Sequence, residues 1–100
     1  MVVTIFRNRH KPGIYDTYLE VAREMSELAR TMPGYISHKT FTAEDGERVT
    51  IAEFADEEGQ RTWSTNMRHL AAKQKGRAEF YSEYRLQVCS LVRENRFPKA

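Results

Sequence analysis

The sequence contains one cysteine and lacks the cysteine pairs, glycine-rich loops and nucleophile motifs that identify many protein classes. With only Cys89 available, no disulfide can form within the chain, and the absence of a Cys-x-x-Cys pair excludes thioredoxin-like and metal-chaperone proteins. Neither glycine pattern for phosphate binding occurs, and there is no Gly-x-Ser-x-Gly motif. These absences exclude the common nucleotide-binding and serine-hydrolase sites.

The chain also has little excess of charge of either sign. Its 16 Lys and Arg residues are interspersed with 14 Asp and Glu residues, which leaves a net charge of +2. Nucleic-acid-binding domains carry a larger, clustered positive charge, so we expect no nucleic-acid partner. There is no signal-peptide pattern and no apolar run of about 18 residues, so we expect no membrane association and a cytoplasmic protein.

The three histidines are spread too widely to form a recognisable metal site. His10, His38 and His69 show no His-x-x-x-His or Glu-x-x-His spacing. A metal held by protein ligands alone usually requires such spacing, so we expect none.

Hydrophobic patterning predicts four strands and two helices. Asp45-Gly46 is a strong hairpin signal, Pro33 ends the first helix and Asp56 can cap the second. The second helix has a candidate break near Asn66, and Gly76 is predicted to end it. Strands are predicted over 2–8, 35–43, 48–54 and 84–93, helices over 14–31 and from Asp56 to about 74, and a helical turn over 77–83.

The resulting order, β-α-β-β-α-β, predicts an α+β protein of the ferredoxin-like kind, with an antiparallel sheet covered by helices on one face. One domain is expected over residues 1–95, followed by a C-terminal tail over 96–100. The last strand is apolar on both sides, because Tyr84 and Leu86 share one side and Cys89 lies on the other. A strand of this kind is normally covered on both faces, so we expect a homodimer formed through the sheet faces.

Candidate site residues gather in the second helix and the segment after it. Trp63, Met67 and Leu70 are spaced to share one helix face, which is typical of core packing and also of a pocket wall. His69 is either a hydrogen-bonded surface residue or part of that pocket.

Further along the chain, Arg77, Phe80 and Tyr81 bring polar groups and flat apolar rings together, a combination that suits a planar aromatic ligand. Asn8, at the end of the first strand, can place an amide against such a ligand.

The sequence resembles the antibiotic biosynthesis monooxygenase family of dimeric α/β-barrel proteins over nearly its whole length. The resemblance rests on the stretches "MPGYISHKTF", "VTIAEFADEEGQRTW" and "HLAAKQKGRAEFYSEYRLQV". It implies a ferredoxin-like subunit with a pocket between sheet and helices and two sheets packed across a dimer. Some members oxidise polyphenolic or quinone-forming substrates with dioxygen and without metal or flavin, whereas close relatives degrade haem.

Carried over by position, Asn8 matches the strand Asn of the haem-degrading relatives and Trp63 matches their helix Trp. Their iron-binding His does not carry over, because Lys73 occupies roughly that place and His69 comes one turn, about 5 to 6 Å, sooner. We therefore expect no haem and no other cofactor.

The expected function is cofactor-independent oxidation of a small aromatic substrate by dioxygen. In this interpretation Asn8 holds an oxyanion, Trp63 forms a ring wall and His69 accepts a proton, while Arg77, Phe80 and Tyr81 bind the substrate. The sequence leaves two alternatives open: a non-catalytic ligand-binding protein and a haem-binding relative.

Overall fold

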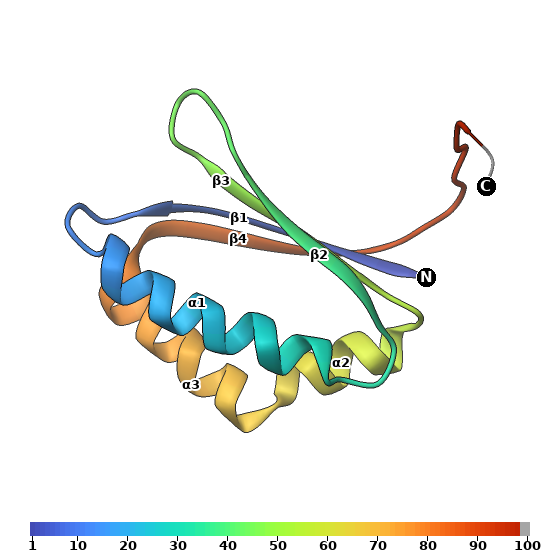
Figure 1. Ribbon diagram of the computed structural model, residues 1–100, viewed down its shortest axis with the longest axis horizontal. Helices are drawn as coiled ribbons and strands as arrows, with labels where there is room; N and C mark the ends of the chain where they lie inside the picture. The colour runs from blue at the N-terminus through green and yellow to red at the C-terminus, as the bar shows by residue number, and fades with distance from the viewer. Residues whose placement is uncertain (99–100) are drawn as a thin grey trace.

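A computed structural model describes residues 1–98 of the chain, apart from the side chains of Met67 and Arg68. Four antiparallel strands form one sheet in the order β2-β3-β1-β4, and the helices lie on the same side of it (Figure 1). This confirms the predicted α+β, ferredoxin-like architecture. The elements are β1 (Val2–His10), α1 (Tyr15–Arg30), β2 (Tyr35–Thr42), β3 (Arg48–Phe54), α2 (Glu57–Thr65), α3 (Met67–Lys75), the π-helical segment η1 (Gly76–Phe80) and β4 (Tyr81–Ser90).

Local sequence signals place the turns and helix ends as predicted. Gly46 has a φ of +91° in the β2–β3 hairpin, a conformation that glycine adopts without strain. The Asp56 side chain caps α2 by accepting a hydrogen bond of 2.7 Å from the backbone N–H of Gly59. At Asn66 the backbone turns extended, with φ −57° and ψ 133°, which separates α2 from α3 at the predicted break.

The last strand was predicted over residues 84–93, and this prediction is wrong at both ends. β4 is aligned by its partner β1, with Val2 opposite Ser90 and His10 opposite Tyr81, so pairing rather than local composition sets its limits. The helical turn predicted over 77–83 is correspondingly shorter and forms η1, which ends at Phe80.

The inward position predicted for Leu70 is also wrong. Its side chain is 42% exposed, because the bend at Asn66 interrupts the helical spacing that would align it with Trp63. The predicted packing of Met67 concerns a side chain outside the described part of the structure.

The space between the sheet and the helices contains a small core. Among the described residues, only Val2, Ala29, Phe54 and Phe80 are buried apolar side chains, and Phe54 is the most completely buried of them. The opposite sheet face has no helix over it (Figure 1), and Phe41 and Ile51 are 49% and 38% exposed. Within residues 1–98, no helix has both the length and the apolar character needed to cross a membrane.

Candidate functional site

A cavity of about 410 Å³ lies between the inner face of the sheet and the helices. This volume is within the range of small-molecule sites, roughly 300 to 1,000 Å³. Its walls are largely apolar and come from strands and helices alike, including Phe6, Val21, Met25, Phe54, Phe80 and Leu86. A space of this size with largely apolar walls can accommodate a small apolar ligand.

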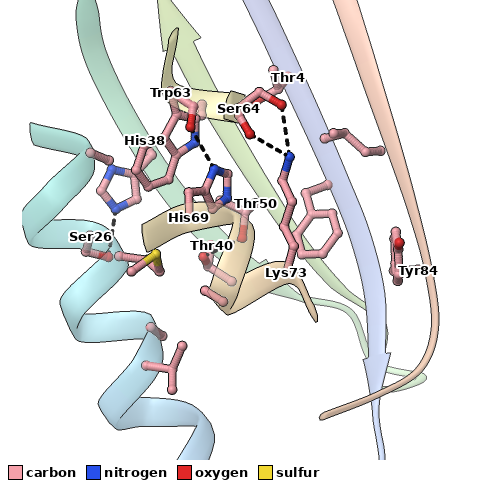
Figure 2. Close-up of a pocket in the computed structure, with 18 of the residues that line it drawn as sticks. Thr4, Ser26, His38, Thr40, Thr50, Trp63, Ser64, His69, Lys73 and Tyr84 are labelled. Atoms are coloured by element: carbon pink, nitrogen blue, oxygen red, sulfur yellow. Dashed lines mark hydrogen bonds between the residues drawn. The ribbon is translucent and has the colours of Figure 1, made fainter. Parts of the chain in front are cut away.

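Trp63 and His69 form a stacked pair on the wall of this cavity. Their ring centroids are 3.9 Å apart and their planes differ by 18°. His69 Nδ1 lies 3.0 Å from the backbone oxygen of Trp63 (Figure 2). A carbonyl oxygen only accepts, so Nδ1 carries the proton and Nε2 keeps its lone pair. The α2–α3 break at Asn66 makes this pair, because it folds the first turn of α3 against the last turn of α2.

The environment of His69 keeps its ring neutral. Burial lowers the pKa of His69 to about 4, the hydrogen bond to Trp63 acts in the opposite direction, and the nearby charge of Lys73 lowers the pKa further. At neutral pH the imidazole is therefore uncharged. Its Nε2 atom has a lone pair and no hydrogen-bond partner among the described residues, and the ring is partly buried. A group of this kind can accept a proton from a bound ligand.

A second histidine borders the same cavity, and sequence reasoning did not select it. His38 Nδ1 lies 2.7 Å from the Tyr35 hydroxyl. Its Nε2 lies 3.0 Å from Ser26 Oγ on α1 (Figure 2). Burial lowers the pKa of His38, and the charge of Arg30 contributes in the same direction. The strand pairing is irregular between Tyr35 and Ser37, and this bulge brings Tyr35 to the same inward side as His38 although the two are three residues apart.

Lys73 is a further cavity residue that the sequence marked only as standing where a haem-degrading relative has its iron ligand. Its ammonium group donates to the backbone oxygen of Ser64 at 3.0 Å and to Ser64 Oγ at 2.9 Å (Figure 2). Burial lowers the pKa of Lys73, and the charge of Arg77 lowers it further. Arg77 also borders the cavity, from η1.

Phe80 and Tyr81 form the end of the cavity near α1. The Phe80 and Tyr18 rings meet edge to face with centroids 5.7 Å apart. Burial raises the pKa of Tyr81, and a hydrogen bond to Tyr18 acts in the same direction, so its phenol stays protonated at neutral pH. A Cβ at Gly76 would lie 2.6 Å from the Tyr81 ring, so glycine at this position allows the ring to pack against η1.

Asn8 is the one sequence-selected site residue that does not border the cavity. Strand alternation places it on the same sheet face as Thr4 and Phe6, which do border it. Asn8 is 2% exposed, and its Oδ1 has no hydrogen-bond partner among the described residues. The structure thus brings Trp63, His69, Arg77, Phe80 and Tyr81 together around one cavity and leaves Asn8 beyond its lining. Among the described residues, no group of three or more His, Cys, Asp or Glu side chains is arranged to hold a metal ion.

Comparison with known proteins agrees with this architecture. The chain is 30% identical to the uncharacterized protein YqjZ of Bacillus subtilis over 80 residues, which cover 80% of this chain and 70% of that protein. It is 29% identical to a jasmonate monooxygenase of Pyricularia oryzae over 100 residues, which cover 95% of this chain but 46% of that enzyme. The chain therefore spans less than half of the fungal relative.

Solved structures share the fold at lower sequence identity. The protein Rv0793 of Mycobacterium tuberculosis superposes with a TM-score of 0.82 at 16% identity, covering 95% of this chain and 98% of that one. SnoaB, a cofactor-independent oxygenase from Streptomyces nogalater, superposes with a TM-score of 0.79 at 18% identity, covering 98% and 97% of the two chains. Residues 1–75 match the family described as antibiotic biosynthesis monooxygenase, and the chain belongs to that family.

Proposed function

We propose that this protein is a cofactor-independent monooxygenase that oxidises a small aromatic substrate of the quinol or anthrone type in its cavity. Membership of the family supports a monooxygenase-type activity. The observation that carries the finer assignment is the neutral, buried His69 stacked on Trp63, because it combines a proton acceptor with a flat ring wall. The Streptomyces relative named above as a cofactor-independent oxygenase is consistent with chemistry of this kind.

The cavity residues have distinct tasks in this mechanism. A planar substrate lies against Trp63 and Phe80, and His69 Nε2 removes a proton from its phenol or activated methylene group. The resulting anion is electron-rich and transfers one electron to dioxygen, and the two radicals combine to form a carbon-bound peroxide anion. This anion takes up the proton held by His69 and becomes a hydroperoxide. The apolar walls keep water away from these reactive species.

Loss of water then completes the reaction. The O–O bond breaks, the second hydrogen leaves the carbon as a proton, and the departing hydroxide combines with this proton to form water. The methylene group becomes a carbonyl, so one molecule of dioxygen supplies one oxygen atom to the product and one to water. The substrate provides all four electrons, and no external reductant enters the balance.

The test is oxygen uptake with 1,8-dihydroxyanthrone, corrected for oxidation without protein. In His69→Phe an aromatic ring still stacks on Trp63 but cannot accept a proton, so kcat should fall about 100-fold or more with little change in KM. His10→Phe is the matched control, since His10 does not border the cavity, and it should retain the wild-type rate. Full activity in His69→Phe would refute the assigned base. Binding without any protein-dependent oxygen uptake would identify a ligand-binding protein instead.

We also propose that the working unit is a homodimer in which the open sheet faces of two copies pack together. The proposal is supported by the exposed apolar side chains on that face, including Phe41 and Ile51. An antiparallel sheet with apolar residues on its uncovered face gains stability when a second layer removes them from water. A monomeric mass by light scattering at micromolar concentration would contradict this assembly.

A further inference from the structure

The cavity contains positive charge without a matching negative charge. Lys73 and Arg77 both border it, and none of the described residues that line it is Asp or Glu. His38 and His69, the other titratable bases in the lining, have lowered pKa values and are neutral at pH 7. The net charge facing the ligand space is therefore positive.

The partners of Lys73 do not neutralise it. Both of its hydrogen bonds go to Ser64, to the backbone oxygen and to the hydroxyl group. Among the described residues Arg77 has no carboxylate within ion-pair distance, and its charge disfavours the nearby charge of Lys73. Partly burying a cation beside another cation is unfavourable unless an anion joins them.

A neighbouring lysine on the same helix shows the contrast. Lys75 lies two residues after Lys73, is absent from the cavity lining, and pairs with Glu79 at 3.9 Å. Within the described part of the chain, the outward lysine thus has an acidic partner and the cavity lysine has none. Lack of acidic residues in this region does not explain the difference, because Glu79 lies only two residues beyond Arg77.

We propose that the cavity binds an apolar organic anion whose negatively charged oxygen group, a carboxylate or a phenolate, is held by Lys73 and Arg77. The apolar part of the ligand lies against the Trp63 and Phe80 side of the cavity. The inference deepens the proposed function by naming the charge of the substrate, and it applies equally if the protein binds without turnover. The carboxylate and phenolate sources share one chemistry and are separated by experiment.

The chain provides its own reporter for this experiment. Trp63 is the only tryptophan and borders the cavity, so its fluorescence responds to a ligand bound there. The probes are 2-naphthoate and its neutral isostere 2-naphthamide, titrated separately at pH 7. Charge-assisted hydrogen bonds contribute about 1.5–3 kcal/mol, so the wild type should prefer the naphthoate by roughly 10- to 100-fold.

Three variants locate the source of the preference. Lys73→Met should abolish most of it, Lys73→Arg should retain it because the charge remains, and Lys75→Met should leave it unchanged. If Lys73→Met fails to fold by circular dichroism, Arg77→Met replaces it with the same expectation. The proposal would be overturned by an unchanged preference in the folded Lys73 or Arg77 variants. It would also be overturned if the wild type selects neither 2-naphthoate over 2-naphthamide nor the ionised form of the phenolic probe 4-nitrophenol.

A phenolic probe distinguishes the two kinds of anion. 4-Nitrophenol absorbs visible light only as its phenolate, so increased absorbance on binding at slightly acidic pH shows that the site selects the ionised form. Tight binding of naphthoate without this change assigns the site to carboxylates, and the reverse assigns it to phenolates. Because every readout is binding, His69→Phe should keep the preference for anions. Failure of the oxidation assay alone would therefore leave this inference standing.

Discussion

Basic side chains have different partners on the two faces of the sheet. On the open face, Arg7 donates two hydrogen bonds to Glu47, at 3.0 and 2.9 Å, and Arg9 pairs with both Asp45 and Glu83. Inside the cavity, the bases have neutral partners and their pKa values are lowered chiefly by burial. On the open face, Arg7 and Arg9 form ion pairs although water already screens their charges. In the cavity, Lys73 and Arg77 have no acidic partner among the described residues, although burial makes an unpaired charge more unfavourable. This difference supports the proposal that the cavity, rather than the charged surface, is the functional region.

The largest expected difference between the two regions is the response of stability to pH. Unfolded histidine takes up a proton near pH 6.5, whereas His69 in the folded protein does so at about 4. Between these values the unfolded chain binds more protons, so stability should fall as pH drops through this window. The loss from His69 should be roughly 3 kcal/mol, at about 1.4 kcal/mol for each tenfold change in affinity for the proton.

Urea unfolding of wild type and His69→Phe between pH 4 and 7 measures this contribution directly. The variant should show a smaller decline, and the difference between the two curves isolates His69 from the carboxylates and from His38. Parallel curves would mean that His69 is as accessible to protons in the folded state as in the unfolded state.

The open face can be tested with a charge placed at its centre. Ile51 lies opposite Ile5 in the sheet and is 38% exposed, so Ile51→Lys should leave the subunit folded but bury a lysine at the proposed dimer contact. Since each dimer carries two substitutions, we expect the dissociation constant to rise roughly 100-fold or more. Analytical ultracentrifugation over a dilution series checks this.

Leu70→Lys is the control, because Leu70 is similarly exposed at 42% but lies on α3. Equal weakening of the dimer by both variants would argue against a contact through the sheet.

The smallest of these effects is expected where η1 meets β4. Gly76→Ala adds a methyl group that would lie 2.6 Å from the Tyr81 ring, which must then shift. Overpacking of this kind costs about 1–3 kcal/mol, and the displaced ring should also weaken binding of 2-naphthoate. Chemical denaturation and Trp63 fluorescence report the two effects. Gly13→Ala is an informative comparison, because Gly13 has open space around its Cα but a φ of +79°, so it tests backbone strain without crowding.

Much of the fold could be predicted because its signals are local. Asp45-Gly46, Pro33 and Asp56 act on their immediate neighbours, and each turn or helix end lies where these residues indicate. The limits of β4 could not be read in this way, since β1 sets them from the other end of the chain. Leu70 was misplaced for a related reason: a continuous helical spacing was assumed across a bend that the sequence marked only as a candidate break.

The candidate site likewise contains residues that the sequence could indicate and others that only the folded structure reveals. Trp63, His69, Arg77, Phe80 and Tyr81 could be selected because they are concentrated in one segment, and all of them border the cavity. His38 could not, because the side of β2 that faces the cavity is set by its pairing with β3, in which His38 lies opposite Ala52. The significance of Lys73 also required the structure, since a lysine on a polar helix is normally solvated and only its neighbours show that it is not.

The sequence by itself determined the order of strands and helices, the turns, the family and the group of aromatic and basic residues around the site. These features depend on residue type and short spacing, which act within a few residues along the chain. Only the tertiary structure decided that the sheet and helices enclose a cavity and that the bend at Asn66 stacks His69 on Trp63. It also decided that Lys73 lies near Arg77 with no acidic residue among the described residues that line the cavity. Burial and charge pairing are properties of groups that meet across the fold, so they become visible only when the chain has folded.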